Sequence, residues 1–265
     1  RTLAGDVEAF ALAAAGYEGP VALPVVGPLS LAASLWLPVG ERVLADGVAL
    51  GDLVGSLGHG VLEHLAAVRA ARSLPLAPAP VPEVDAAPAA AGPSDIVVLH
   101  EPLLPQVLRG QIPTFSGISA LRAHSAEAVT ARLASLVAAW APVDVVIAIS
   151  AEPAAIRAAG AAGPAGLALD TSALGGEGWE ALAELVEQGV GVWSTSVAHL
   201  SEGDADPRPV ARAFLDPWRS LGLGVDDLDL VLLPRPGLAE CSPSVASATL
   251  RQVARVAGEL GELIA

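Results

Sequence analysis

The stretch Val143–Ile149, VDVVIAI, is an apolar run that only Asp144 interrupts. A strand with one solvated face alternates apolar and polar residues, whereas a parallel strand buried on both faces reads as a nearly continuous apolar segment. Polar residues, Ser150 and Glu152, follow directly. The run therefore predicts a buried parallel strand with polar side chains at its carboxyl end.

Similar runs recur along the chain and alternate with segments rich in Ala and Leu. Strand–helix repetition without a hairpin signal predicts an α/β fold with a parallel sheet. The predicted strands, of which the first three are expected to be neighbours, are Val21–Val26, Ile96–Leu99, Val143–Ile149, Gly166–Leu169, Val190–Thr195 and Val231–Leu233. The predicted helices are Thr2–Ala15, Leu50–Ala71, Ala126–Trp140 after the cap Ser125, Glu177–Gln188, Pro207–Leu221 and a last helix from Ser242 or Ser244 towards Ile264.

Six predicted strands are fewer than a closed eight-stranded barrel needs. The segment Ser73–Ser94 adds none, because its prolines and alanines are typical of a linker or a surface excursion. We therefore expect a TIM-barrel-like (β/α)8 sheet, as a single domain over residues 1–265, whose first strands precede Arg1. An open doubly wound sheet is the alternative, but no Gly-rich loop with GxGxxG spacing follows any strand.

Composition and charge exclude several classes of protein. The 265 residues include 29 acidic and 14 basic ones, which gives a net charge of −15. Phosphate groups would repel such a chain, so neither nucleic acid nor a membrane surface is expected as a partner. No apolar run reaches the roughly 18 residues of a membrane span. We expect a cytoplasmic protein that binds a small-molecule substrate, and the oligomeric state stays open.

The single cysteine, Cys241, excludes an intrachain disulfide framework and a Cys-rich metal site. Polar residues instead gather where the predicted strands end, which in a parallel barrel is the rim that carries the active site. His100 and Glu101 follow the second strand, Asp170 the fourth and Arg235 the sixth. We expect these four side chains to face one cavity and to bind substrate.

Several stretches also carry a family resemblance. They include VVGPLSLA at 25–32, LHEPLLP at 99–105 and LALD at 167–170, and the similarity extends over residues 21–46, 97–123, 166–174, 209–223 and 232–260. Together they resemble the catalytic C-terminal barrel of cobalamin-independent methionine synthase, as in methionine-synthase-like proteins of actinobacteria. This architecture is shared with uroporphyrinogen decarboxylase. The resemblance implies a role in methionine biosynthesis: methyl transfer from a methyl-folate to a homocysteine-type thiol that zinc activates.

The zinc ligands of that family are mostly absent here. Its His-x-Cys pair falls near Ala148 and Ser150, its late cysteine falls on Pro236, and only its acidic ligand has a match, in Asp170. A zinc site needs at least three protein ligands, so the zinc of the family is not expected here, and the residues point to no other cofactor. The family's Asp that holds the substrate's amino group falls on His100, and the Glu beside it is kept.

These residues are compatible with three functions. The first is a methyltransferase of methionine-synthase type. The second is a diverged barrel without zinc that binds an amino-acid-like or acidic ligand, with Glu101 receiving an ammonium group and Arg235 a carboxylate. The third is a relative of the decarboxylases that holds an acidic substrate through Arg235 and Asp170. The fold alone does not decide among them, since barrels host unrelated functions.

A structural role is the alternative for every one of these residues. The alternatives are a side-chain cap for Asp170, an ion pair with Arg109 or Arg122 for Glu101, a packed neutral imidazole for His100 and a salt bridge for Arg235. Cys241 is expected to face a helix N-terminus, and His59 and His64 are expected on the surface of the long helix.

Overall fold

In the computed structural model, six parallel strands form one sheet in which each strand pairs with the next one along the chain. The structure describes residues 3–15, 17, 19–38, 40–72, 95–198, 205–224 and 228–264, so the predicted excursion Ser73–Ser94 lies outside the described residues. The strands are β1 (Ala22–Val26), β2 (Ile96–His100), β3 (Asp144–Ala148), β4 (Gly166–Leu169), β5 (Gly191–Val197) and β6 (Leu230–Pro234).

Helices follow the strands and surround the sheet. They are α1 (Leu3–Ala13), α2 (Pro28–Ser34), α3 (Gly47–Arg72), α4 (Leu104–Arg109), α5 (Ala126–Ala139), α6 (Pro153–Gly160), α7 (Gly176–Val186), α8 (Arg208–Ser220) and α9 (Pro243–Ile264). Short 3-10 turns are η1 (Val43–Ala45), η2 (Thr171–Ala173) and η3 (Leu238–Glu240). Among the residues so described, no helix is both long enough and apolar enough to cross a membrane.

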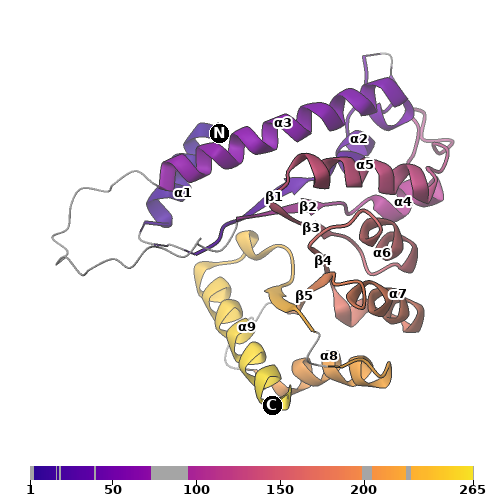
Figure 1. Ribbon diagram of the computed structural model, residues 1–265. Helices are drawn as coiled ribbons and strands as arrows, with labels where there is room; N and C mark the ends of the chain where they lie inside the picture. Colours follow the sequence, from indigo (N-terminus) through magenta and orange to yellow (C-terminus); the bar gives the residue numbers. More distant parts are fainter. Residues whose placement is uncertain are drawn as a thin grey trace.

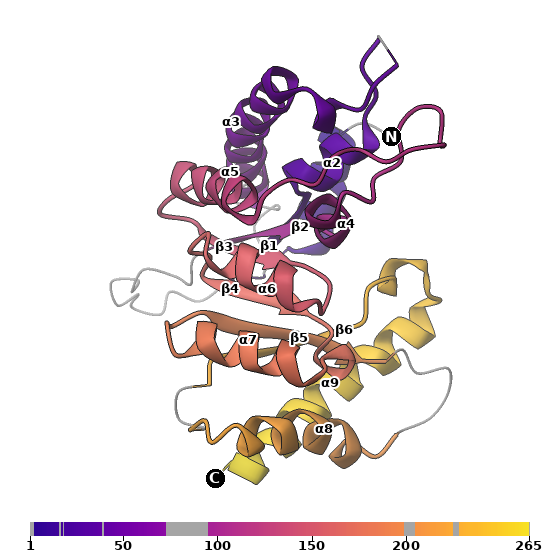
Figure 2. The same ribbon diagram turned by 90° about the vertical axis from the view of Figure 1, so that its right-hand side faces the viewer.

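The sheet curls into a half-barrel, and α3, α5, α6, α7, α8 and α9 follow one another around its outside (Figure 1). Figure 2 shows α6 and α7 lying over one face of the strands. The predicted α/β class, its TIM-barrel-like arrangement and the neighbouring order of the first three strands are confirmed. The doubly wound alternative is wrong, because the strand order never reverses. The six described strands stay open, with β1 and β6 at the edges.

Strand alternation divides the side chains between two cores. The larger core lies between the sheet and the helices, and Val97, Leu99 and Ile147 contribute to it from β2 and β3. A small second core of Val98, Val146 and Ala168, with Trp193 packed against it, lies on the concave face. Successive side chains of a strand point to opposite faces, so neighbouring residues at a strand end also point apart. This rule decides which of the predicted site residues can meet.

Three short helices, α2, α4 and α6, lie in segments where no helix was predicted. Each has a proline in its first turn: Pro28, Pro105 and Pro153. Proline suits this position because its fixed φ is helical and the amide hydrogen that it lacks has no partner there. The proline after each strand thus signals the start of a helix. The signal was missed because these helices are too short to show a helical pattern of apolar residues.

Both edge strands carry a proline whose nitrogen faces outward. The amide of Gly27 donates to the His100 carbonyl, and by alternation the main-chain groups of Pro24 point away from β2. On the other edge the Arg235 amide donates to the Val197 carbonyl, so Pro234 points away from β5. Each edge therefore lacks one hydrogen-bond donor.

The amino end of the sheet is held by the carboxylate of Asp95, which is 8% exposed. Its Oδ1 accepts from the Val21 amide at 3.0 Å and from Arg72 Nη1 at 3.3 Å, and its Oδ2 accepts from Arg69 Nε at 2.7 Å. Burial raises the pKa of Asp95, but these hydrogen bonds and the two arginine charges outweigh it and lower the pKa below its usual 3.8. The carboxylate joins the end of α3 to β1 and β2.

We predict that Asp95→Asn destabilises the protein by about 2 kcal/mol, because the amide cannot accept from all three donors and leaves two arginines without their counter-charge. The depressed pKa of the carboxyl means that its contribution is present above pH 3.8 and is lost as the pH falls through the folded-state pKa. Urea unfolding at pH 7 and pH 3 measures both effects. Asp144→Asn, at the exposed start of β3, is the matched control and should change little.

Candidate functional site

The carboxyl ends of β4 and β6 bring Asp170 and Arg235 together. Arg235 Nη2 lies 3.4 Å from Asp170 Oδ2 and donates to Ser172 Oγ at 3.0 Å. Asp170 Oδ1 in turn accepts from the Ser172 amide at 3.0 Å and from its hydroxyl. The side chains are 46% and 32% exposed for Arg235 and Asp170, so the pair lies at a mouth open to solvent. Both structural alternatives, the cap and the salt bridge, are present in this geometry.

A chain of hydroxyl groups lies beside this ion pair. Thr171 Oγ1 and Ser194 Oγ share a hydrogen bond of 2.7 Å, and Ser194 Oγ and Ser196 Oγ share one of 2.8 Å. Ser194 and Thr171 are buried, whereas Ser172 is exposed. These hydroxyls can reorient to donate to or accept from a polar ligand without rebuilding the backbone.

A cavity of about 200 Å³ lies between these hydroxyls and helix α8. Its polar wall is formed by Thr171, Ser172 and Ser196. Its apolar wall comes from α8, with Pro209, Val210, Ala213 and Phe214. The α8 wall was not predicted, because nothing in the sequence indicates which face of α8 meets these hydroxyls.

His100 ends β2 on the concave side, where alternation aligns it with Val98 of the small core. Neighbouring protein desolvates the ring and lowers its pKa below 6.5, so the neutral imidazole prevails at pH 7. Asp170 follows Ala168 on the same face, two strands away. Strand spacing puts about 10 Å between the two positions.

Glu101 lies on the other side of the sheet and is fully buried. Its Oε1 accepts from the Leu29 amide at 2.9 Å, and its Oε2 accepts from the Ser30 amide at 2.7 Å and the Ser30 hydroxyl at 2.6 Å. The carboxylate therefore occupies the N-terminus of α2, where helix amides lack partners. Gly27 makes the approach possible, since a Cβ there would lie 2.4 Å from the Glu101 carboxyl carbon.

The expectation that four side chains share one cavity is thus corrected. Asp170 and Arg235 meet, His100 shares the concave side with Asp170, and Glu101 points to the helices. The physical reason is strand alternation: adjacent residues such as His100 and Glu101 cannot face the same side. Burial raises the pKa of Glu101 to about 7, against the opposing effect of its hydrogen bonds from Ser30 and Leu29.

The remaining sequence candidates have other surroundings. The expected pairing of Glu101 with Arg109 or Arg122 is not found among the described residues, and Arg109 Nη2 lies 2.9 Å from Glu152 Oε1 instead. Cys241 Sγ donates to the Gly237 carbonyl at 3.6 Å. His64 lines a cavity between helices, a position that its place on a long helix did not indicate.

The zinc site of the resembling family does not fit these residues. The Ala148 and Pro236 side chains have no donor atom and the Ser150 hydroxyl is a poor zinc ligand, which leaves Asp170 alone of the four positions. Within the described part of the chain, no three His, Cys, Asp or Glu side chains gather in a group that could hold a metal ion.

We predict that Glu101 makes folding stability fall between about pH 5 and pH 8. A carboxyl whose folded-state pKa is about 7 takes up a proton on folding above pH 4.5, so its contribution is largest at low pH and is lost as the pH rises through 7. Urea unfolding of Glu101→Gln against the parent chain isolates this slope. The variant should be less stable at pH 5 yet flatter with pH, and an unchanged slope would contradict the assignment. Glu177→Gln is the exposed control.

Comparisons with known proteins show no family for this chain. No family model matches it, and no curated protein matches it. Among solved structures it is similar to dihydropteroate synthase of Xanthomonas albilineans, solved in complex with indole-2-carboxylic acid and 6-chloroguanine. The TM-score is 0.48 at 15% sequence identity, over 92% of this chain and 69% of that chain. A match at this level does not transfer a function.

Proposed function

We propose that this chain is a TIM-barrel-like protein, a single domain over residues 1–265, that binds a small amino-acid-like ligand where β4, β5 and β6 end, without zinc chemistry. The observation that carries the proposal is the Asp170–Arg235 pair, whose opposite charges stand 3.4 Å apart. Ser172, which binds both side chains, also lines a cavity of about 200 Å³. Ligand sites in parallel barrels form at this end of the strands.

The two charges suit the two ends of a zwitterion. The Arg235 guanidinium can receive a carboxylate through two parallel hydrogen bonds, and the Asp170 carboxylate can receive an ammonium group. This assignment moves the ammonium contact from Glu101, which is buried under α2, to Asp170. His100, on the same concave side, adds a neutral hydrogen-bonding group at the far side of the rim.

The cavity sets the size and character of the ligand side chain. A volume of about 200 Å³ corresponds to roughly seven water molecules, which suits a short chain. Val210, Ala213 and Phe214 favour an apolar tail, and the hydroxyls of Ser172 and Ser196 can bind a polar end. Homocysteine and methionine have these properties.

Methyl transfer to a homocysteine-type thiol is the finer function that the family resemblance implies. It needs a metal to lower the thiol pKa. The positions Ala148, Ser150 and Pro236 do not supply the ligands, so the proposal contains no step through zinc. Incubation of the full chain with methyl-folate and homocysteine should give no methionine, and sustained turnover would contradict this part.

We predict that methionine binds more tightly than either of its truncated analogues, 3-(methylthio)propylamine and 4-(methylthio)butanoate. Calorimetric titration measures the three dissociation constants. Arg235→Gln should raise the dissociation constants of methionine and 4-(methylthio)butanoate about tenfold, because both ligands carry a carboxylate that the guanidinium binds. The dissociation constant of 3-(methylthio)propylamine should not change. Asp170→Asn should raise the dissociation constants of methionine and of the amine, and leave that of 4-(methylthio)butanoate unchanged.

The control is Arg212→Gln on the exposed side of α8, which removes the same charge without touching the cavity. It should bind all three molecules as the parent does. Equal loss in the Arg212 and Arg235 variants would mean that only overall charge matters. Absence of heat with every ligand would end the proposal.

A further inference from the structure

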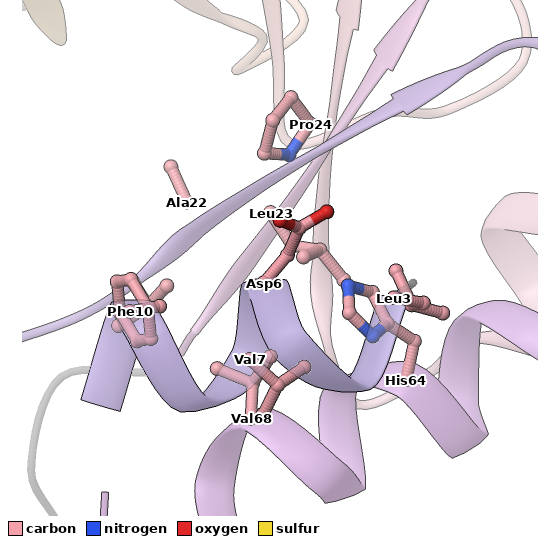
Figure 3. Close-up of a pocket in the computed structure, with 10 residues that line it drawn as sticks. Leu3, Asp6, Val7, Phe10, Ala22, Leu23, Pro24, His64 and Val68 are labelled. Atoms are coloured by element: carbon pink, nitrogen blue, oxygen red, sulfur yellow. The ribbon is translucent and has the colours of Figure 1, made fainter. Parts of the chain in front are cut away.

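A second cavity, of about 330 Å³, lies at the other side of the fold between α1, α3 and β1, the first of the six described strands. Figure 3 shows it, with Leu3, Val7 and Phe10 of α1 on one side and Val68 and His64 of α3 beside them. The volume is within the range of small-molecule pockets, and the walls are mainly apolar, as such pockets require. No sequence prediction pointed to this place.

The edge of β1 supplies main-chain acceptors to this cavity. Ala22 and Pro24 line it, and their carbonyl groups point away from β2 by strand alternation. Pro24 has no amide hydrogen, so this part of the edge has more acceptors than donors. A ligand that fits here therefore brings hydrogen-bond donors.

The charged residues around the cavity also favour a ligand with hydrogen-bond donors. Asp6 lines the cavity, and Figure 3 shows its carboxylate reaching from α1 towards β1. An adjoining hollow of about 580 Å³ along α1 and α3 shares His64 and is lined also by Glu8 and Glu63. The described residues that line the two hollows include Asp and Glu side chains but neither Lys nor Arg. Anions are repelled here and cations attracted.

We propose that the cavity between α1, α3 and β1 binds an organic cation with an apolar body, a primary amine on an aryl or branched alkyl group. The apolar part lies against Leu3, Val7 and Phe10. The ammonium group donates to the Asp6 carboxylate and to a carbonyl of the β1 edge. This site is separate from the rim formed by β4 to β6, and it is independent of the function proposed for that rim.

Three probes of one shape test the proposal on the full chain: 1-naphthylmethylamine, 1-naphthylmethanol and 1-naphthoate, each titrated by calorimetry at pH 7. We expect the amine to bind at least about tenfold more tightly than the alcohol, the effect of one charge-assisted hydrogen bond, and the carboxylate to bind least. Asp6→Asn should bring the amine down to the affinity of the alcohol while leaving the alcohol unchanged.

Asp52→Asn is the matched control, because it removes the same charge from α3 about 18 Å along the helix from His64 and does not line the cavity. It should keep the preference for the amine. Equal affinity for all three probes, no binding by any of them, or an undiminished preference in Asp6→Asn would each overturn the proposal. Circular dichroism confirms that each variant is folded, and the comparison of probes on the parent chain needs no variant.

Discussion

The buried carboxylate of Glu101 is the contact on which the carboxyl end of the sheet depends. Its oxygens take the amides of Leu29 and Ser30, its own amide donates to the Ala148 carbonyl, and the Ser30 hydroxyl also receives the Leu103 amide. One residue thus positions the turns that follow β1, β2 and β3. Removing it would leave the amides of Leu29 and Ser30 and the hydroxyl hydrogen of Ser30 without their acceptor, a cost of about 1–3 kcal/mol for each group.

This contact also explains why the Gly-Pro and Glu-Pro motifs occur together in the sequence. Gly27 leaves room for the carboxyl group of Glu101, and Pro28 starts the helix whose amides bind it. The motifs form one structural unit and need no ligand to account for them. Residues that carry part of the family resemblance thus have a structural role of their own.

The sequence was sufficient for the strands because a doubly buried strand leaves a continuous apolar run, as in Val143–Ile149. It also located helix ends where a cap or a glycine was present: Ser125 Oγ accepts from the Ala128 amide, and Gly189 has a φ of 88°. It did not predict which side chains face the concave side of the sheet and which face the helices, and this difference separates Glu101 from Asp170. Contacts such as that of Ser172 with Arg235 join residues far apart in the chain, and a single sequence contains no record of them.

The two outward-facing prolines have a consequence for how copies of this protein meet. An open sheet edge is a template on which strands of other molecules can assemble, and a chain that is 53% apolar would be prone to it. A strand arriving at β1 would find no donor at Pro24, and one arriving at β6 would find none at Pro234. At these two positions the edges of the six described strands thus discourage the intermolecular pairing that leads to aggregates and fibrils.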